Sequence, residues 1–181
     1  MPEITITKLE AAHRQLRTAI ALWFTDGDPV STHALVFAAH QVLQDLMRRE
    51  KRTPQLAFNL SHIKPEYRKE IDAKLKEAGY FIKHGDRGKA GMLPSISFNP
   101  TLTGLFIVYT MSGLRYYKQD ISAEEMTFDF WHVIHEPQLL TDAGKNIFKD
   151  SYGIEMTNAL RTVPKGEFFE HACDFFRKHQ R

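Results

Sequence analysis

The sequence predicts an all-α protein, a bundle of six or seven helices in a single domain covering residues 1–181. Apolar side chains recur at three- and four-residue spacing through most of the chain, which is the period of an amphipathic helix. Helix start signals precede several of these segments. Only residues 95–98 alternate like a strand, and we find no second stretch that would pair with them. These three observations exclude a sheet-based fold.

The first predicted helix begins near Thr5 or Thr7 and ends near Thr25. Its apolar residues follow the spacing of an amphipathic helix. The short sequence T-D-G-D-P then breaks it, and Gly27 is the expected left-handed residue of that turn. Because the connection is so short, we expect the next helix to be an antiparallel neighbour.

The second helix should run from its capping residue Asp28 to about Arg48, with Pro29 in the first turn. Apolar residues cover much of its circumference, whereas a surface helix shows a single apolar stripe. We therefore predict that this helix lies at the centre of the bundle. His33 and His40 are seven residues apart on one of its apolar faces, so they should point inward.

The third helix should start at Lys64 and continue to about His84, with Gly79 marking a close approach to a neighbour. An irregular glycine-rich segment, residues 85–100, separates it from the fourth helix. The fourth helix opens at the Asn-Pro pair before residue 101 and is apolar on most sides. It is therefore the other candidate for deep burial.

The C-terminal part of the chain should contain further helices. Ser122 and Glu125 have the spacing of a capping box, and the helix that they open should stop before Pro137. Residues 139–148 are expected to form a short helix, and residues 164–178 the last one.

Composition indicates a cytoplasmic protein that does not enter a membrane. There is no apolar run of membrane-spanning length, and the first residues lack the pattern of an export signal. A single cysteine, Cys173, excludes an intramolecular disulfide and fits a reducing compartment.

The net charge of +2 is too small to indicate nucleic-acid binding by itself. No cofactor motif is present, since the P-loop pattern is absent and Gly88-Lys89 is followed by alanine.

Histidine is the first candidate for chemistry, because the chain holds nine of them. His33 and His40 share a helix face, and His132 and His135 are three residues apart on another helix. Facing histidine-bearing helices can hold a metal ion, so these four residues form an alternative metal site. The simpler interpretation is that the imidazoles are hydrogen bonded within the core, and no metal is then required.

The second candidate lies at the end of the third helix, where Lys83 and His84 are followed by Asp86 and Arg87. Asp86 would orient His84 for proton transfer, while Lys83 and Arg87 would hold a phosphate. This grouping suits cleavage of RNA through its own 2′-hydroxyl. The structural alternative is a helix C-terminus whose side chains cap carbonyls. Basic and aromatic residues at other helix ends, including residues 115–118, add to the RNA hypothesis but are equally compatible with helix capping and core packing.

Three stretches, residues 8–16, residues 28–33 and residues 81–87, resemble an uncharacterised bacterial family with an F-F-K-H-A-D-R-D-like segment. More distantly, helices leading to a charged histidine motif resemble the HEPN superfamily, whose members are all-α, usually dimeric and often RNases. Their motif places an arginine before the histidine, at a spacing that no arginine has here. The resemblance assigns His84 as the catalytic imidazole only if Lys83 or Arg87 takes the place of that arginine.

The leading hypothesis is thus a HEPN-like homodimer that binds RNA or cleaves it without a metal, with His84, Asp86 and Arg87 as catalytic residues. One alternative is a metal-binding protein or hydrolase that uses the histidine cluster. The other is a non-catalytic module that binds a protein partner through exposed apolar surface.

Overall fold

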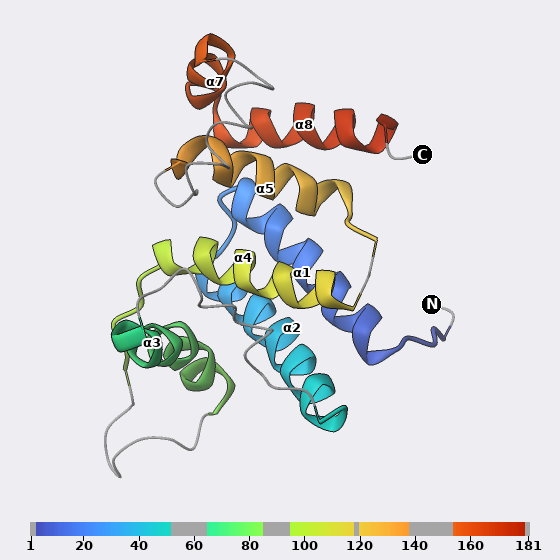
Figure 1. Ribbon diagram of the computed structural model, residues 1–181, viewed down its shortest axis with the longest axis vertical. Coiled ribbons are helices and arrows are strands. Elements are labelled where there is room, and N and C mark those ends of the chain that lie inside the picture. Colours follow the sequence, from blue (N-terminus) through green and yellow to red (C-terminus); the bar gives the residue numbers. More distant parts are fainter. Residues whose placement is uncertain (1–2, 52–64, 85–94, 118–119, 138–153, 180–181) are drawn as a thin grey trace. The chain divides into compact units, whose positions relative to one another are not determined.

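The computed structural model describes residues 3–51, 65–84, 95–117, 120–137 and 154–179, and these ranges hold seven helices and no strand (Figure 1). The helices are α1 (Lys8–Phe24), α2 (Pro29–Arg49), α3 (Pro65–Lys83), α4 (Thr101–Tyr116), α5 (Ala123–His135), α7 (Ile154–Arg161) and α8 (Lys165–His179). The all-α class is confirmed. The glycine-rich residues 85–94 and the expected helix at 139–148 lie outside the described residues.

Contacts along the chain form two compact units. Unit 1, Met1–Asp120, contains α1 to α4, and unit 2, Ile121–Arg181, contains α5, α7 and α8. The single domain expected from the sequence stays a prediction. None of the described helices combines the length and apolarity needed to cross a bilayer.

Helix α1 begins where its sequence signals predict. The Glu10 backbone N–H donates to the hydroxyl of the capping residue Thr7 at 3.1 Å. After the helix ends, Asp26 takes the left-handed conformation with φ 50°, so the expectation that Gly27 would do so is wrong. Aspartate tolerates this region better than most residues. The Gly27 N–H instead closes the turn by donating to the Leu22 carbonyl at 2.8 Å.

Helix α2 is the centre of unit 1, because it packs against α1, α3 and α4 (Figure 1). Its start is set locally, since Asp28 accepts from the Ser31 backbone N–H at 2.7 Å and Pro29 is the first residue. His33 and His40 are only 1% and 0% exposed. The predicted central position and the inward-facing imidazoles are both confirmed.

Helices α2 and α3 come together at Gly79, as the sequence suggested. A Cβ built on Gly79 would lie 2.2 Å from ring carbons of Phe37, far inside van der Waals contact. The Phe37 ring is 2% exposed and meets Tyr80 edge-on at a centroid distance of 5.0 Å. The absent side chain therefore sets how closely α3 approaches α2.

Unit 2 is built on α5, which packs against α7 and α8. The predicted capping box is present: the Glu125 N–H donates to Ser122 Oγ at 3.2 Å, and the Ser122 N–H donates to the Glu125 carboxylate at 2.8 Å. Helix α7 was not predicted from the sequence. Its last residue, Arg161, donates through Nε to the Ile134 carbonyl near the end of α5 at 2.8 Å. This bond satisfies a carbonyl that the helix end leaves open.

Candidate functional site

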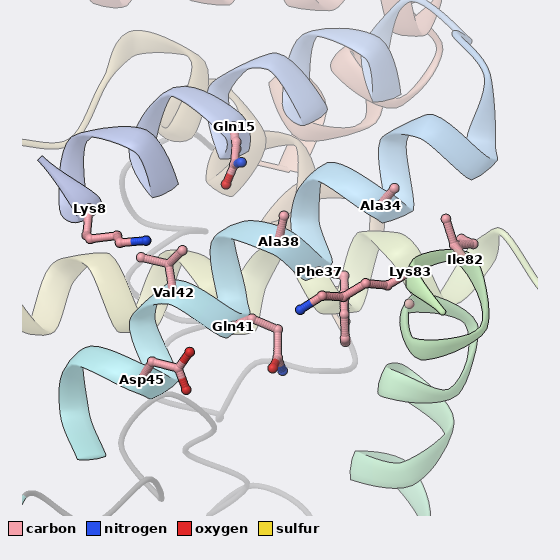
Figure 2. Close-up of a pocket in the computed structure, with 11 residues that line it drawn as sticks. Lys8, Gln15, Ala34, Phe37, Ala38, Gln41, Val42, Asp45, Ile82 and Lys83 are labelled. Atoms are coloured by element: carbon pink, nitrogen blue, oxygen red, sulfur yellow. The ribbon is translucent and has the colours of Figure 1, made fainter. Parts of the chain in front are cut away.

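A pocket of about 470 Å³ opens on unit 1, between α1, α2 and α3 (Figure 2). Its volume lies within the roughly 300–1,000 Å³ typical of small-molecule sites. Eleven residues line it, and they divide into cations, polar side chains and an apolar floor.

The two cations come from different helices. Lys8 is the first residue of α1 and Lys83 the last residue of α3, and both line the pocket. Figure 2 shows their side chains extending from the two sides toward α2. Residues far apart in sequence thus supply two ammonium groups to one cavity. Ammonium groups bind phosphates as point charges.

Three polar side chains that are not lysines also line the pocket, those of Gln15, Gln41 and Asp45. Gln15 projects from α1 toward α2, and its buried Oε1 accepts no hydrogen bond within the described part of the chain (Figure 2). Gln41 on α2 donates through Nε2 to Gln44 at 3.3 Å. Asp45 accepts from the guanidinium of Arg48 at 2.8 Å, and that ion pair is exposed. The Gln15 carbonyl is therefore an acceptor for which a ligand could supply the donor.

The floor of the pocket is small and apolar. Ala34, Ala38 and Val42 lie four residues apart along α2 and all line the cavity. This spacing places them in one row on the helix surface. Phe37 and Ile82 add apolar surface beside α3. A flat apolar group fits this row, with polar contacts available around it.

His84 follows Lys83 directly but does not line the pocket. It is half-buried at the end of α3, where its backbone N–H donates to the Tyr80 carbonyl at 3.1 Å. Its imidazole stacks on the Tyr80 ring at a centroid distance of 6.2 Å. Asp86 and Arg87 lie outside the described residues, so the predicted grouping of these two with His84 stays a prediction.

His33 and His40 lie in the core of unit 1. His33 Nδ1 is hydrogen bonded to Thr103 Oγ1 at 3.1 Å. Both imidazoles lie beside Phe106, at centroid distances of 5.3 and 5.2 Å. Burial lowers the pKa of His33, an effect that the Leu75 carbonyl partly opposes.

Burial also lowers the pKa of His40 well below its usual range, and the positive charges of Lys76 and Arg48 add to this. Both rings are therefore neutral near pH 7.

His132 and His135 lie in unit 2, on α5. His132 stacks on Phe128 at a ring-centroid distance of 6.1 Å. Burial lowers the pKa of His132, and the negative charge of Glu136 partly opposes this effect. His135 stacks on Trp131 at a ring-centroid distance of 3.5 Å, and its Nδ1 donates a hydrogen bond to the Trp131 carbonyl at 3.0 Å. In the ranges that the structure describes, histidine, cysteine, aspartate and glutamate form no group of three or more suited to a metal. The metal alternative thus gains no support there.

Unit 2 has a different pocket, of about 350 Å³, formed by residues of α5, α7 and α8. Aromatic and aliphatic side chains form most of its wall, and Met156 and Phe175 are 55% and 56% exposed. Its polar lining residues are Glu167 and His171, which form an exposed pair at 3.8 Å. No lysine or arginine lines it. This pocket suits an apolar partner and not an anion.

The basic residues at the ends of α2 and α8 agree with the simpler interpretation, that they interact with the carboxyl ends of helices. Arg48 and Arg49 lie in the last turn of α2, and residues 177–179 in the last turn of α8. Arg177 donates to Glu124 at 2.9 Å, and this glutamate is buried. Their charges complement helix dipoles and neighbouring carboxylates, so a phosphate site is not needed to explain them.

Comparisons with protein-family models, curated proteins and solved structures give no match for this chain. The HEPN-like resemblance and the resemblance to a bacterial family therefore stay predictions.

Sequence reasoning selected Lys83 but missed Lys8, Gln15 and Gln41. One signal was available: Lys8 and Gln15 are seven residues apart and share a face of α1. No local pattern relates that face to the end of α3, because the packing of three helices brings them together.

Proposed function

We propose that this protein binds RNA through the pocket of unit 1, as the HEPN-like resemblance implies, with Lys8 and Lys83 holding phosphates. The supporting observation is that Lys83, selected from the sequence as a phosphate holder, lines one cavity together with Lys8. Both side chains are exposed, so a polyanion can reach them without desolvating a buried charge. Neutralising backbone phosphates releases counterions, which is the main source of affinity for such contacts.

The binding test uses a labelled single-stranded RNA titrated at several salt concentrations. The double variant Lys8→Gln/Lys83→Gln should bind more weakly and show a salt slope shallower by about 1.4, the value for two lost contacts to a single strand. Lys74→Gln is the matched control, because Lys74 lies nine residues before Lys83, about two and a half turns away on the opposite side of α3. Equal slopes for the wild type and the double variant would remove the proposal.

The catalytic part of the proposal assigns proton transfer to His84, its orientation to Asp86 and phosphate binding to Arg87 with Lys83. It is supported by the position of His84, which is half-buried and directly follows a lysine of the pocket. A mixed RNA substrate incubated with a chelator should be cleaved by the wild type. His84→Ala should cut the rate by about 10²–10⁴-fold, the usual contribution of a general acid or base.

His171→Ala, which alters an exposed histidine of unit 2, should leave the rate unchanged. Absence of cleavage by the wild type, or equal cleavage by His84→Ala, would reduce the proposal to RNA binding alone.

A second candidate function, a protein-interaction module, is favoured by the apolar pocket of unit 2 and its exposed Met156 and Phe175. A second copy of this chain is the partner that the HEPN-like resemblance implies. Sedimentation should then give a mass near twice 20.9 kDa. Phe175→Glu should shift it toward the monomer, because a charge cannot be buried without a partner. Lys178→Glu, at another exposed position of α8, is the control. A wild-type monomer would argue against this function.

A further inference from the structure

We infer that the pocket of unit 1 accepts a single unpaired nucleotide of RNA, whose base lies on the apolar floor and hydrogen-bonds to Gln15. This inference rests on the proposed RNA binding and specifies what enters the pocket. It follows from three properties of the cavity: cations on two sides, an acceptor that lacks a donor, and a row of small apolar side chains.

The placement of the cations matches the chemistry of a nucleotide within a strand. Each internal nucleotide has one phosphate on its 5′ side and another on its 3′ side. Lys8 and Lys83 extend into the pocket from α1 and from α3, with α2 between them (Figure 2). A strand that crosses α2 can therefore place a phosphate near each ammonium group while the base between them turns toward the floor.

The polar groups match the edge of a base. The Gln15 Oε1 atom is buried and accepts no hydrogen bond from the described residues, and every RNA base carries at least one N–H donor on its edge. An unsatisfied buried acceptor costs free energy, and an incoming N–H removes that cost. Gln41 lines the same cavity and carries a second amide. Two glutamines allow hydrogen bonding to any of the four bases, so the site would not depend strongly on sequence.

The floor matches the face of a base. Ala34, Ala38 and Val42 form one row along α2, and none of them carries a polar side-chain group. A base offers a flat apolar face, which loses contact with water when it lies on such a surface. In duplex RNA this face is stacked and the edge is paired, so only an unpaired nucleotide can use all three parts of the pocket.

The test compares two single strands of nine nucleotides with the same backbone, one fully abasic and one abasic except for the central nucleotide. A duplex of nine base pairs, in which every base is paired, is the third RNA. The wild type should bind the strand with one base about tenfold more tightly than the fully abasic strand. Because the abasic strands carry the same phosphates, this difference isolates the contribution of the base. Gln15→Leu should not change binding of the duplex, because its bases are paired and stacked and cannot reach the floor of the pocket.

Gln15→Leu should remove the tenfold gain while binding of the fully abasic strand stays unchanged. Gln41→Leu should reduce the gain in the same direction, which keeps the test valid if one variant folds poorly. Asn158→Leu makes the same amide-to-aliphatic change at an exposed position of unit 2 and should have no effect.

The two proposals fail in different ways. If no strand binds, RNA binding and the nucleotide pocket are both overturned. If the abasic strand and the strand with one base bind equally, or if Gln15→Leu weakens duplex binding as much as it weakens binding of the strand with one base, only the nucleotide pocket is overturned.

Discussion

Helices α2 and α5 each carry two histidines and each pack against the other helices of their unit, yet the imidazoles lie in different surroundings. α2 is packed on three sides, by α1, α3 and α4, so His33 and His40 are fully buried beside Phe106. In unit 2, α5 packs against α7 and α8, and His132 and His135 are half-buried. Burial by neighbouring side chains, and not the spacing of histidines, decides whether a ring becomes part of the core.

The two pockets differ in the chemistry of their lining residues. The pocket of unit 1 combines two lysines, two glutamines and Asp45 with apolar residues, whereas the pocket of unit 2 is almost entirely apolar. The first can bind an anion that carries a flat ring, and the second can cover the side chains of a protein partner. The two pockets therefore suit different ligands. Each pocket depends on how the helices of its unit pack, and measurements of stability can test that packing.

The largest effect is expected at the ring between the two buried histidines. Phe106 is fully buried, so Phe106→Ala should lower the free energy of unfolding by about 3–5 kcal/mol. Phe175→Ala in unit 2 removes a ring that is 56% exposed and should cost no more than about 0.5 kcal/mol. Urea denaturation would measure both. Similar losses for the two variants would contradict the contrast in packing, and Phe106→Leu would provide a milder variant if Phe106→Ala does not fold.

The next effect is a loss of stability in acid. Burial lowers the pKa of His33 and of His40 in the folded state, while the unfolded chain binds protons near pH 6.5. Stability is therefore fully present above pH 6.5 and is lost as the pH falls from there toward the folded pKa values. Each ring contributes up to about 1.4 kcal/mol per pH unit in that window.

Denaturation in urea between pH 7.5 and pH 5 would measure this dependence. His40→Leu should flatten it, because the variant has no proton to gain at that site on unfolding. His171→Leu, which changes an exposed histidine of unit 2, serves as the control. A wild-type stability that does not change over this range would contradict the neutral, buried state of the two rings.

A smaller effect is expected where α3 meets α2. Gly79→Ala would force its Cβ into the Phe37 ring, which Tyr80 and Phe106 hold from other sides, and overpacking of this kind costs about 1–3 kcal/mol. Gly104→Ala is the matched control, since its Cβ would lie 3.8 Å from the nearest Trp23 atom and would fit without strain. That variant should gain up to about 1 kcal/mol from helix propensity. Thermal unfolding would show whether the two substitutions shift stability in opposite directions.

The smallest effect is expected at the start of α5. Ser122→Ala removes one bond of the capping box and should cost about 1 kcal/mol. Ser122→Asp keeps an acceptor at the cap and should retain most of the stability. In a background that carries Trp23→Phe, the fluorescence of the remaining Trp131, which lies on α5, would follow unfolding of this helix in urea. Equal stability of the wild type and Ser122→Ala would show that the cap does not contribute to the stability of α5 and that packing against α7 and α8 is sufficient.

Much of the helical structure could be predicted from the sequence because helix starts are set within a few residues. Thr7, Asp28 and Ser122 each accept a bond from a backbone N–H three residues later, as their sequence context indicated. Helix α7 was missed because its eight residues show no comparable start signal in the sequence. It is fixed partly by a bond from Arg161 to the Ile134 carbonyl, which no local pattern reveals.

The candidate site was predictable only in part. Lys83 drew attention because it adjoins His84, and that local grouping can be read from the chain. Lys8 and Gln15 carry no such signal, since their importance depends on facing Lys83 across α2 (Figure 2). Which residues line the pocket depends on how three helices pack together, so it cannot be predicted from any one of the helices.

By itself, the sequence determined the all-α class, the helix starts and the amphipathic faces, because capping and periodicity act over a few residues. Tertiary structure decided which imidazoles lost water and which lysines came to share a cavity. Both depend on how many helices surround a given face, and this is set by side chains such as Phe37 and by absent ones, as at Gly79. The chemistry proposed for this protein follows from that packing.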